Sequence, residues 1–261
     1  MPLVFRNAEV LGVIGAHPLN TSGTAQVLEA ARRAGVRRVV FSSTSAVYEN
    51  STTSPHTPDE VVVPDLVYAM TKQSAEQICR AYAADYGLDV VICRFFNVYG
   101  PHQDIHRVSP PFTSYVAKEL VNGRRPNLFN QSSARRDYVH ADDVADLLVK
   151  MMGSPAHHAA DVFNVGTGTA HSVPELYDLF RTISGSDIEP IYHDPTEYWD
   201  RYPTLFEGLP LDRDRVSKEV FKESLADISA SVAEFDWKPS VPIDAGIRSV
   251  YEYALAHAVE T

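Results

Sequence analysis

Tyr68 and Lys72 are the residues of this sequence whose types and spacing most directly suggest chemistry. They stand four residues apart, in Tyr-Ala-Met-Thr-Lys, on a segment with helical periodicity, so their side chains share one helix face. A free tyrosine has a pKa of about 10 and is a poor base at neutral pH. A nearby ammonium group stabilises the phenolate and can lower that pKa by roughly 1–3 units. The pair could therefore exchange a proton with a substrate hydroxyl group, although the same spacing also occurs on solvated helix faces.

Hydroxyl side chains gather in residues 41–48, Phe-Ser-Ser-Thr-Ser-Ala-Val-Tyr, directly after a predicted strand. Ligands of parallel α/β sheets bind at the carboxyl ends of the strands. Thr44 could therefore hydrogen-bond the oxygen with which Tyr68 exchanges a proton, and we expect both hydroxyls to face one cleft, with the Lys72 amine within reach. The alternative is a turn rich in Ser and Thr.

Two further stretches offer polar groups to an anionic ligand. Asn97 follows an apolar strand, in Arg-Phe-Phe-Asn-Val-Tyr-Gly-Pro, and carries both hydrogen-bond donors and an acceptor. Arg136, in Arg-Arg-Asp-Tyr-Val-His-Ala-Asp-Asp, could bind a diphosphate through two parallel N–H groups. Asp142 could cap the helix that follows. A turn capped by Asn97 and a surface pair between Arg136 and an aspartate are the alternatives.

The elements that would position these groups alternate between helices and strands. Periodicity predicts a helix over 20–35, capped by Thr21 or Ser22 and ended by Gly35, and a second helix over 66–86. Apolar runs over 36–43 and 88–94 predict buried strands, so a parallel sheet is expected. Further helices are predicted at 113–122, 141–152 and 242–258, with a strand at 162–165 and an irregular segment at 186–213.

Composition and charge exclude several classes of partner. The net charge of −11 repels phosphate backbones and anionic lipids, so we expect neither nucleic acid nor a membrane surface as a partner. No apolar run approaches the roughly 20 residues that span a bilayer, and the first residues do not resemble a secretory signal. Cys79 and Cys93, the two cysteines, lie in apolar patterns and indicate a reducing, cytoplasmic location.

The four stretches, in this order, resemble the extended short-chain dehydrogenase/reductase family, which includes NAD-dependent nucleotide-sugar epimerases, dehydratases and decarboxylases. The resemblance runs from about residue 20 to 258 and also includes Asn-Thr-Ser-Gly-Thr at 20–24, Val-Leu-Glu-Ala-Ala-Arg at 27–32, Phe-Asn-Val-Gly at 163–166 and Trp-Lys-Pro at 237–239. The implied fold is α/β, with a Rossmann-like parallel sheet in residues 1–100 and return elements at about 140–170. Residues 101–139 and 171–261 would form a smaller C-terminal substrate-binding lobe.

The resemblance also implies a role for each residue around the reacting groups. Tyr68 would be the catalytic acid and base, Lys72 would hold the nicotinamide ribose and lower the Tyr68 pKa, and Thr44 would bind the reacting sugar hydroxyl. The cofactor would be NAD, with NADP as the alternative, and its nicotinamide side would be lined by Ser42, Phe95 and Phe96.

On the substrate side, the resemblance implies a nucleotide-diphosphate sugar as the partner. Asn97 and Arg136 would bind its diphosphate, and residues 125–129, with Asn127 and Phe129, would lie near the nucleotide base. The helices at 20–34 and 68–86 carry apolar residues beyond one core-facing stripe. Equivalent helices pair across a two-fold axis in relatives, so a homodimer through them is expected.

The two residues after Thr44 distinguish between the reactions that members of this family catalyse. Related 4,6-dehydratases carry Asp-Glu there and many decarboxylases keep a Glu at the second position, whereas this chain has Ser45 and Ala46, neither of which moves a proton at C5 or C6. The related 3,5-epimerase/reductases use a Cys near this turn, where the chain has Ser45. A 4-epimerase, acting through a transient 4-keto sugar, is therefore the expected isomerase activity, with a 4-reductase or a sugar oxidase as alternatives.

Residues 1–19 depart from the family pattern, because the glycine-rich Gly-x-x-Gly-x-x-Gly turn that binds the NAD diphosphate is absent. Gly12 and Gly15 have the first spacing, but Pro18 occupies the third position. One interpretation equates this segment with a shortened form of the segment that follows the family's fourth strand, and another treats 9–15, 20–34 and 37–43 as a new βαβ unit. We expect the 261-residue chain to bind NAD weakly and to turn over slowly or not at all. The competing function is a catalytically impaired relative that binds a sugar nucleotide or acts by dimerising.

Overall fold

A parallel sheet forms the centre of the molecule and confirms the predicted α/β fold. The computed structural model describes residues 18–107, 110–128, 134–194 and 221–257. Strands β1 (Val39–Thr44), β2 (Val90–Phe95) and β6 (Ala159–Val165) pair in the order β1-β2-β6, all parallel. Five of the six residues of β2 are buried, because helices cover both faces of the sheet.

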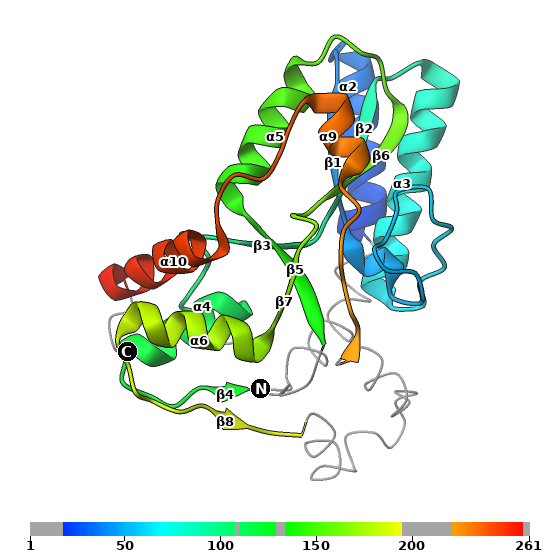
Figure 1. The fold of residues 1–261 in the computed structure, drawn as a ribbon. Coiled ribbons are helices and arrows are strands. Elements are labelled where there is room, and N and C mark those ends of the chain that lie inside the picture. Colours follow the sequence, from blue (N-terminus) through cyan, green and yellow to red (C-terminus); the bar gives the residue numbers. More distant parts are fainter. Residues whose placement is uncertain (1–17, 108–109, 129–133, 195–220, 258–261) are drawn as a thin grey trace.

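Two pairs of helices cover the two faces of this sheet (Figure 1). On one face, α2 (Gly23–Arg33) and α3 (Val67–Tyr86) contribute Leu28, Cys79 and Ala83 to a cluster with β2. On the other face, α5 (Ala141–Gly153) and α9 (Ser229–Phe235) pack their apolar side chains against alternate residues of the same strand. Neighbouring residues of β2 therefore serve opposite faces, as a strand requires.

Three helices form a separate lobe below the sheet in Figure 1. These are α4 (Phe112–Val121), α6 (Val173–Ser184) and α10 (Ile243–His257), which share one buried apolar cluster. The short parallel pair β4 (Asn127–Leu128) and β8 (Ile191–Tyr192) lies at their edge. Helix α6 was not predicted, although Ser172 and Glu175 form a complete capping box at its start, with Pro174 in its first turn.

A third sheet connects the parallel sheet to the lobe. Strand β3 (Asn97–Tyr99) pairs in parallel with β5 (Arg135–His140), which also pairs with antiparallel β7 (Ala170–Ser172). Strand β3 begins two residues after the end of β2, so the chain passes directly from the central sheet into the connecting sheet. This continuity places Asn97 at the junction between the two.

Most predicted elements are present with ends shifted by a few residues, but two predicted helix caps are wrong. The first helix begins with a π-helical turn over Pro18–Ser22, and the Ser22 side chain makes no capping hydrogen bond. At α5 the cap is His140, whose Nδ1 accepts from the Asp142 backbone N–H at 3.2 Å. Asp142 itself cannot cap, because β5 continues directly into the helix and Asp142 already lies in its first turn. The predicted irregular segment lies mostly outside the described residues, and its residues 191–192 form β8.

Gly246 is required where α10 crosses the ring of Tyr99. A Cβ atom at position 246 would lie 2.7 Å from Cζ and 2.8 Å from Cε2 of Tyr99, which is far inside van der Waals contact. We expect Gly246→Ala to lower the free energy of unfolding by about 1–3 kcal/mol through this overpacking, although alanine favours a helix by about 1 kcal/mol. Urea denaturation measures the change. Gly153→Ala is the control, because its Cβ would meet open space, and equal stabilities of the two variants would contradict the prediction.

Candidate active site

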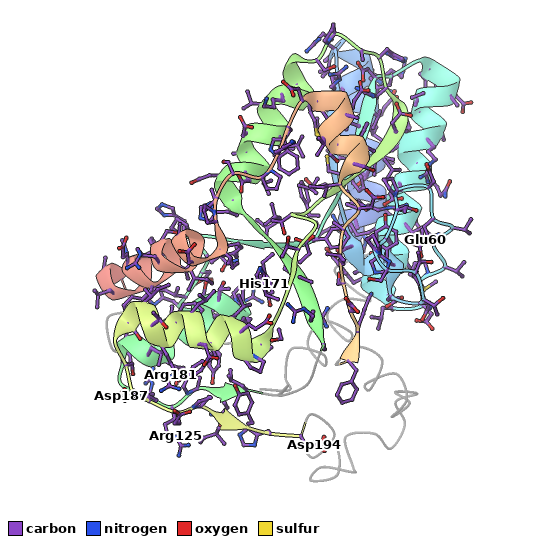
Figure 2. The ribbon with its side chains drawn as sticks, viewed as in Figure 1. Glu60, Arg125, His171, Arg181, Asp187 and Asp194 are labelled. Carbon is purple, nitrogen blue, oxygen red and sulfur yellow. The ribbon has the colours of Figure 1, made fainter. Side chains whose placement is uncertain are left out.

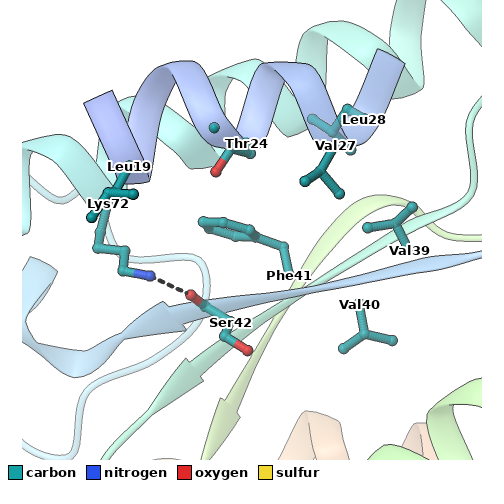
Figure 3. Close-up of a pocket in the computed structure, with 10 residues that line it drawn as sticks. Leu19, Thr24, Val27, Leu28, Val39, Val40, Phe41, Ser42 and Lys72 are labelled. Atoms are coloured by element: carbon teal, nitrogen blue, oxygen red, sulfur yellow. Dashed lines mark hydrogen bonds between the residues drawn. The ribbon is translucent and has the colours of Figure 1, made fainter. Parts of the chain in front are cut away.

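The first two turns of α3 carry Tyr68 and Lys72 to the carboxyl end of β1. The Lys72 Nζ donates a hydrogen bond to the backbone carbonyl of Ser42 at 2.9 Å and lies 5.3 Å from the centre of the Phe41 ring (Figure 3). Burial lowers the pKa of the Lys72 amine below its ordinary value, because the charged form loses solvation. Tyr68 is 45% exposed, and its hydroxyl makes no hydrogen bond within the described residues. The phenol is thus accessible to a ligand beside an anchored cation.

A cavity of about 330 Å³ opens between α2 and β1 next to the Lys72 amine. Figure 3 shows Lys72 and Ser42 at one end of this cavity and apolar side chains along the rest. A long ligand could place a polar group at the Lys72 end and an apolar surface against the helix. The lining residues are Leu19, Gly23, Thr24, Val27, Leu28, Val39, Val40, Phe41, Ser42 and Lys72.

Thr44 ends β1 and begins a 3-10 turn over Ser45–Tyr48. Its Oγ1 accepts from the Ala46 backbone N–H at 3.2 Å, so the hydroxyl proton is left to donate to another group. Its register partner on β2 is Phe95, which is partly exposed and packs at the edge of the cluster between the sheet and α5. The neighbouring Phe96 is 5% exposed and packs with Val47 and Tyr48, so its ring belongs to the core beneath the turn.

Asn97 and Arg136 stand on neighbouring strands of the connecting sheet. Asn97 pairs with Tyr138 of β5, two residues after Arg136, and its Nδ2 donates to the Asp137 carbonyl at 2.9 Å. The amide oxygen of Asn97 is consequently the atom that remains to accept from a ligand. The structure therefore brings together the two residues expected to bind an anionic group, although they are 39 positions apart in the sequence.

The carboxylate of Asp137 holds this part of the connecting sheet in place. It is fully buried and accepts from the Thr167 N–H and hydroxyl at 2.7 Å each, the Gly168 N–H at 2.9 Å and the Ala226 N–H at 3.3 Å. Burial raises the pKa of the Asp137 carboxyl, and the four hydrogen bonds oppose that shift. No local pattern in the sequence predicts this role for Asp137, since its donors come from residues 30 to 89 positions away.

Of the two expected nucleotide-site residues, the structure describes Asn127, which lies apart from this group. Asn127 is on the small β4–β8 sheet, where its Oδ1 contacts the His193 Nε2 at 2.8 Å, and Phe129 lies outside the described residues. The neighbouring Arg125 donates to the carbonyls of Glu189 and Pro190. Figure 2 shows Arg125 and Arg181 at this end of the lobe, near Asp187. The stretch 125–128 is thus held by hydrogen bonds against the segment that precedes β8.

Comparison with known proteins places this arrangement in a family. Residues 16–166 match the NAD dependent epimerase/dehydratase family. The chain belongs to this family. The NAD dependent epimerase/dehydratase family is a family of enzymes, and the matched region includes the cavity, Tyr68, Lys72, Asn97 and Arg136.

Individual relatives in this epimerase/dehydratase family agree with the assignment. The chain is 34% identical over 236 residues to a UDP-glucose 4-epimerase of Mycolicibacterium smegmatis, covering 90% of this chain and 68% of the relative. It is 30% identical over 238 residues to a mouse dTDP-D-glucose 4,6-dehydratase, covering 90% and 60%. The structure of UDP-glucose 4-epimerase from Thermotoga maritima with UDP-glucose is similar, with a TM-score of 0.76 and 28% identity over 91% of this chain and 69% of that one. The chain therefore spans about two thirds of the length of these relatives.

Within the described residues, no helix is long and apolar enough to cross a membrane, and no group of acidic, histidine or cysteine side chains is arranged to hold a metal ion. The candidate site thus consists of the Tyr68–Lys72 pair, the hydroxyls at the end of β1, and the Asn97–Arg136 pair on the connecting sheet.

Proposed function

We propose that this chain is a nucleotide-sugar 4-epimerase that works through a transient 4-keto sugar. The observation that carries the proposal is the Lys72 amine, which is bound to the carboxyl end of β1 one helical turn from the exposed Tyr68 hydroxyl. The similarity to UDP-glucose 4-epimerases supports the same reaction class. Ser45 and Ala46 supply no acid or base for a dehydration, which favours epimerisation over the dehydratase chemistry named for other relatives.

Tyr68 takes the proton from the sugar C4 hydroxyl and returns it after the ring has turned over. Thr44 donates its free hydroxyl proton to the same sugar oxygen, which fixes the oxygen next to the phenol. Lys72 stabilises the phenolate form of Tyr68 by its positive charge. Because the pair both removes and restores one proton, the reaction needs no further acid or base.

We assign a nicotinamide dinucleotide to the cavity beside Lys72. The amine has three N–H groups, and the Ser42 carbonyl takes only one of them within the described residues, so two can bind ribose hydroxyls. Ser42 and Phe95 would border the nicotinamide, with the backbone of Phe96 completing the turn behind it. The bound dinucleotide would accept and return the hydride from C4, and we infer NAD rather than NADP, following the family's name.

The substrate diphosphate is assigned to Asn97 and Arg136, which stand on the neighbouring strands β3 and β5. The nucleotide would extend toward the lobe, with Asn127 and Phe129 near its base. We infer that the lobe formed around α4, α6 and α10 is the substrate-binding part and that the parallel sheet is the cofactor-binding part. Asn127 lies on the β4–β8 sheet at the edge of the lobe, whereas Lys72 is bound to the parallel sheet.

Direct assay of the purified chain tests the proposed reaction. UDP-glucose and UDP-galactose are incubated separately with the chain and added NAD, and the two sugars are separated by chromatography. Conversion in both directions to the same ratio is the expected result, because an epimerase reaches one equilibrium from either side. Release of a stable keto sugar, or net consumption of the cofactor, would indicate a dehydratase or an oxidase instead.

We infer a homodimer through the exposed faces of α2 and α3, in a cytoplasmic protein. Tyr86 is 57% exposed at the end of α3, where Arg32 of α2 lies 4.9 Å from its ring. Light scattering should give about twice the chain mass of 28.9 kDa. Tyr86→Glu should shift the protein toward the monomer, because a charged carboxylate would replace an aromatic ring at the interface and would have to be desolvated there. Val149→Glu, on an exposed face of α5, is the control and should leave the dimer intact.

A further inference from the structure

We propose that Glu76 and Arg94 are positioning residues that fix helix α3 on the sheet and thereby hold Lys72 at the end of β1. The proposal rests on the proposed function for its consequence in catalysis, but its geometric part concerns the helix and strand alone. Neither residue touches the cavity beside Lys72, and neither has been given a role in the reaction above.

The contact between the two side chains is a buried bidentate ion pair. Glu76 on α3 is fully buried and accepts from Arg94 Nε at 3.0 Å and Nη2 at 2.8 Å. Ser43 of β1 also donates its hydroxyl to Glu76 Oε1 at 2.5 Å. Ser43 and Arg94 are register partners on β1 and β2. The Glu76 carboxylate of α3 is therefore bound to side chains at paired positions of two adjacent strands.

Two more hydrogen bonds extend this contact to the third strand. Arg94 Nη1 donates to the Tyr48 hydroxyl at 2.9 Å, and that hydroxyl donates to Asn164 Oδ1 of β6 at 2.8 Å. Asn164 is the register partner of Arg94. The buried network thus crosses all three strands of the parallel sheet one residue before Thr44, the last residue of β1.

Helical spacing carries the constraint to the candidate site. Glu76 is one turn after Lys72 and two turns after Tyr68, which corresponds to about 6 and 12 Å along the helix axis. The three residues share a face because they recur at intervals of four. The contacts of Glu76 fix both the rotation of α3 about its axis and its position along that axis. They consequently fix where the Lys72 amine meets the Ser42 carbonyl.

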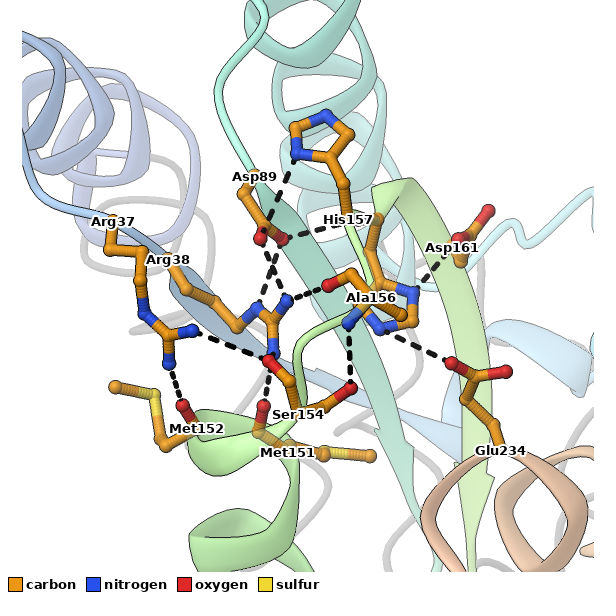
Figure 4. A network of polar contacts seen from close by, with 11 residues as sticks. Arg37, Arg38, Asp89, Met151, Met152, Ser154, Ala156, His157, Asp161 and Glu234 are labelled. Atoms are coloured by element: carbon orange, nitrogen blue, oxygen red, sulfur yellow. Dashed lines mark hydrogen bonds and ion pairs between the residues drawn. The ribbon is translucent and has the colours of Figure 1, made fainter.

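Buried ion pairs are poor evidence of stabilisation, since desolvation offsets much of their attraction. A second pair in the same molecule allows the positional role to be separated from stability. Arg38 binds Asp89 in the same bidentate way, at 3.0 and 2.7 Å, and also donates to the carbonyls of Met151 and Ala156 (Figure 4). That pair lies at the start of β1, at the end of the strands opposite to the candidate site.

The experiment compares Glu76→Gln with Asp89→Asn in the full chain. Each variant is studied at the urea concentration at which the same small fraction of its molecules is unfolded. The Lys72 amine is titrated by competitive acetylation from pH 7 to 11, with mass spectrometry of the peptide that contains it. Glu76→Gln should raise the pKa of the Lys72 amine toward its ordinary value, because the amine leaves its buried contact with Ser42. Asp89→Asn should leave that titration unchanged. Arg94→Lys, which keeps the charge but loses the bidentate geometry, should move it in the same direction by less.

The outcomes separate the two hypotheses. If the chain epimerises UDP-glucose, Glu76→Gln should also lower kcat by about 10- to 100-fold, as expected for a misplaced acid–base pair. Asp89→Asn should leave kcat within about threefold at matched stability. If the wild-type chain does not epimerise, the proposed function fails while the titration still tests the positioning. A fall or no change of the Lys72 pKa in Glu76→Gln, or an equal rise in Asp89→Asn, overturns the proposal.

Discussion

Tyr68→Phe is expected to reduce epimerisation of UDP-glucose by about 10²- to 10⁴-fold in kcat, the usual contribution of a positioned acid or base. The substitution removes one oxygen from a side chain that is 45% exposed and makes no hydrogen bond through that oxygen within the described residues. Folding should therefore be unaffected, and the KM for the sugar nucleotide should change little. Initial rates with saturating NAD, measured together with urea denaturation, check both expectations.

Tyr86→Phe is the matched control for this substitution, because Tyr86 lies on the same helix and is similarly exposed. It should retain full activity. Activity of Tyr68→Phe within tenfold of wild type would exclude the phenol as the proton carrier. A rise in KM with an unchanged kcat would instead indicate that Tyr68 binds the substrate without taking part in the proton transfer.

Asp137→Asn is expected to lower the free energy of unfolding by about 1–4 kcal/mol, although it changes a single heavy atom. Each carboxylate oxygen accepts two hydrogen bonds, from Thr167 at one oxygen and from Gly168 and Ala226 at the other. An asparagine must turn its NH₂ group toward one of these sets of donors. Two donors then lose their acceptor, at about 1–3 kcal/mol for a buried donor such as the Ala226 N–H and less for the half-buried Thr167 or the exposed Gly168.

Urea denaturation at neutral pH measures the effect of Asp137→Asn. Asp146→Asn, on an exposed position of α5, is the control and should stay within about 0.5 kcal/mol of wild type. A calorimetric titration with UDP should also show weaker binding in Asp137→Asn, because Asn97 is bound to the Asp137 carbonyl and Arg136 is its neighbour. Stability within 1 kcal/mol of wild type would show that a neighbouring group or water replaces the lost acceptor.

The positions of the long elements could be predicted because their signals are local. The predicted helix over 66–86 is observed as Val67–Tyr86, and Gly87 ends it with a φ of 63°. The predicted strand over 88–94 is observed as Val90–Phe95. Helical periodicity and the glycine requirement are set by neighbouring residues, so they can be read without knowledge of the fold. The shared face of Tyr68 and Lys72 follows from the same local geometry.

The short strands β3, β4, β7 and β8 were not predicted, because two or three residues are too few to show alternation. Their formation depends on partners distant in the sequence, as Asn97 and Tyr138 illustrate. Helix α6 differs, since its capping box is a local feature of the sequence. Ser172 followed three residues later by Glu175 is sufficient to predict where this helix begins.

The sequence alone determined the family and the parallel α/β fold and supplied the candidate site residues as predictions, because ordered motifs and periodicity are properties of the chain itself. Only the tertiary structure decided which groups meet. It paired Glu76 with Arg94, gave the Asp137 carboxylate its four donors and seated Lys72 against Ser42. Such pairings arise when buried polar groups must find partners among whatever the fold brings near. Their distances along the chain, from 18 to 89 residues, leave no periodic signal to read.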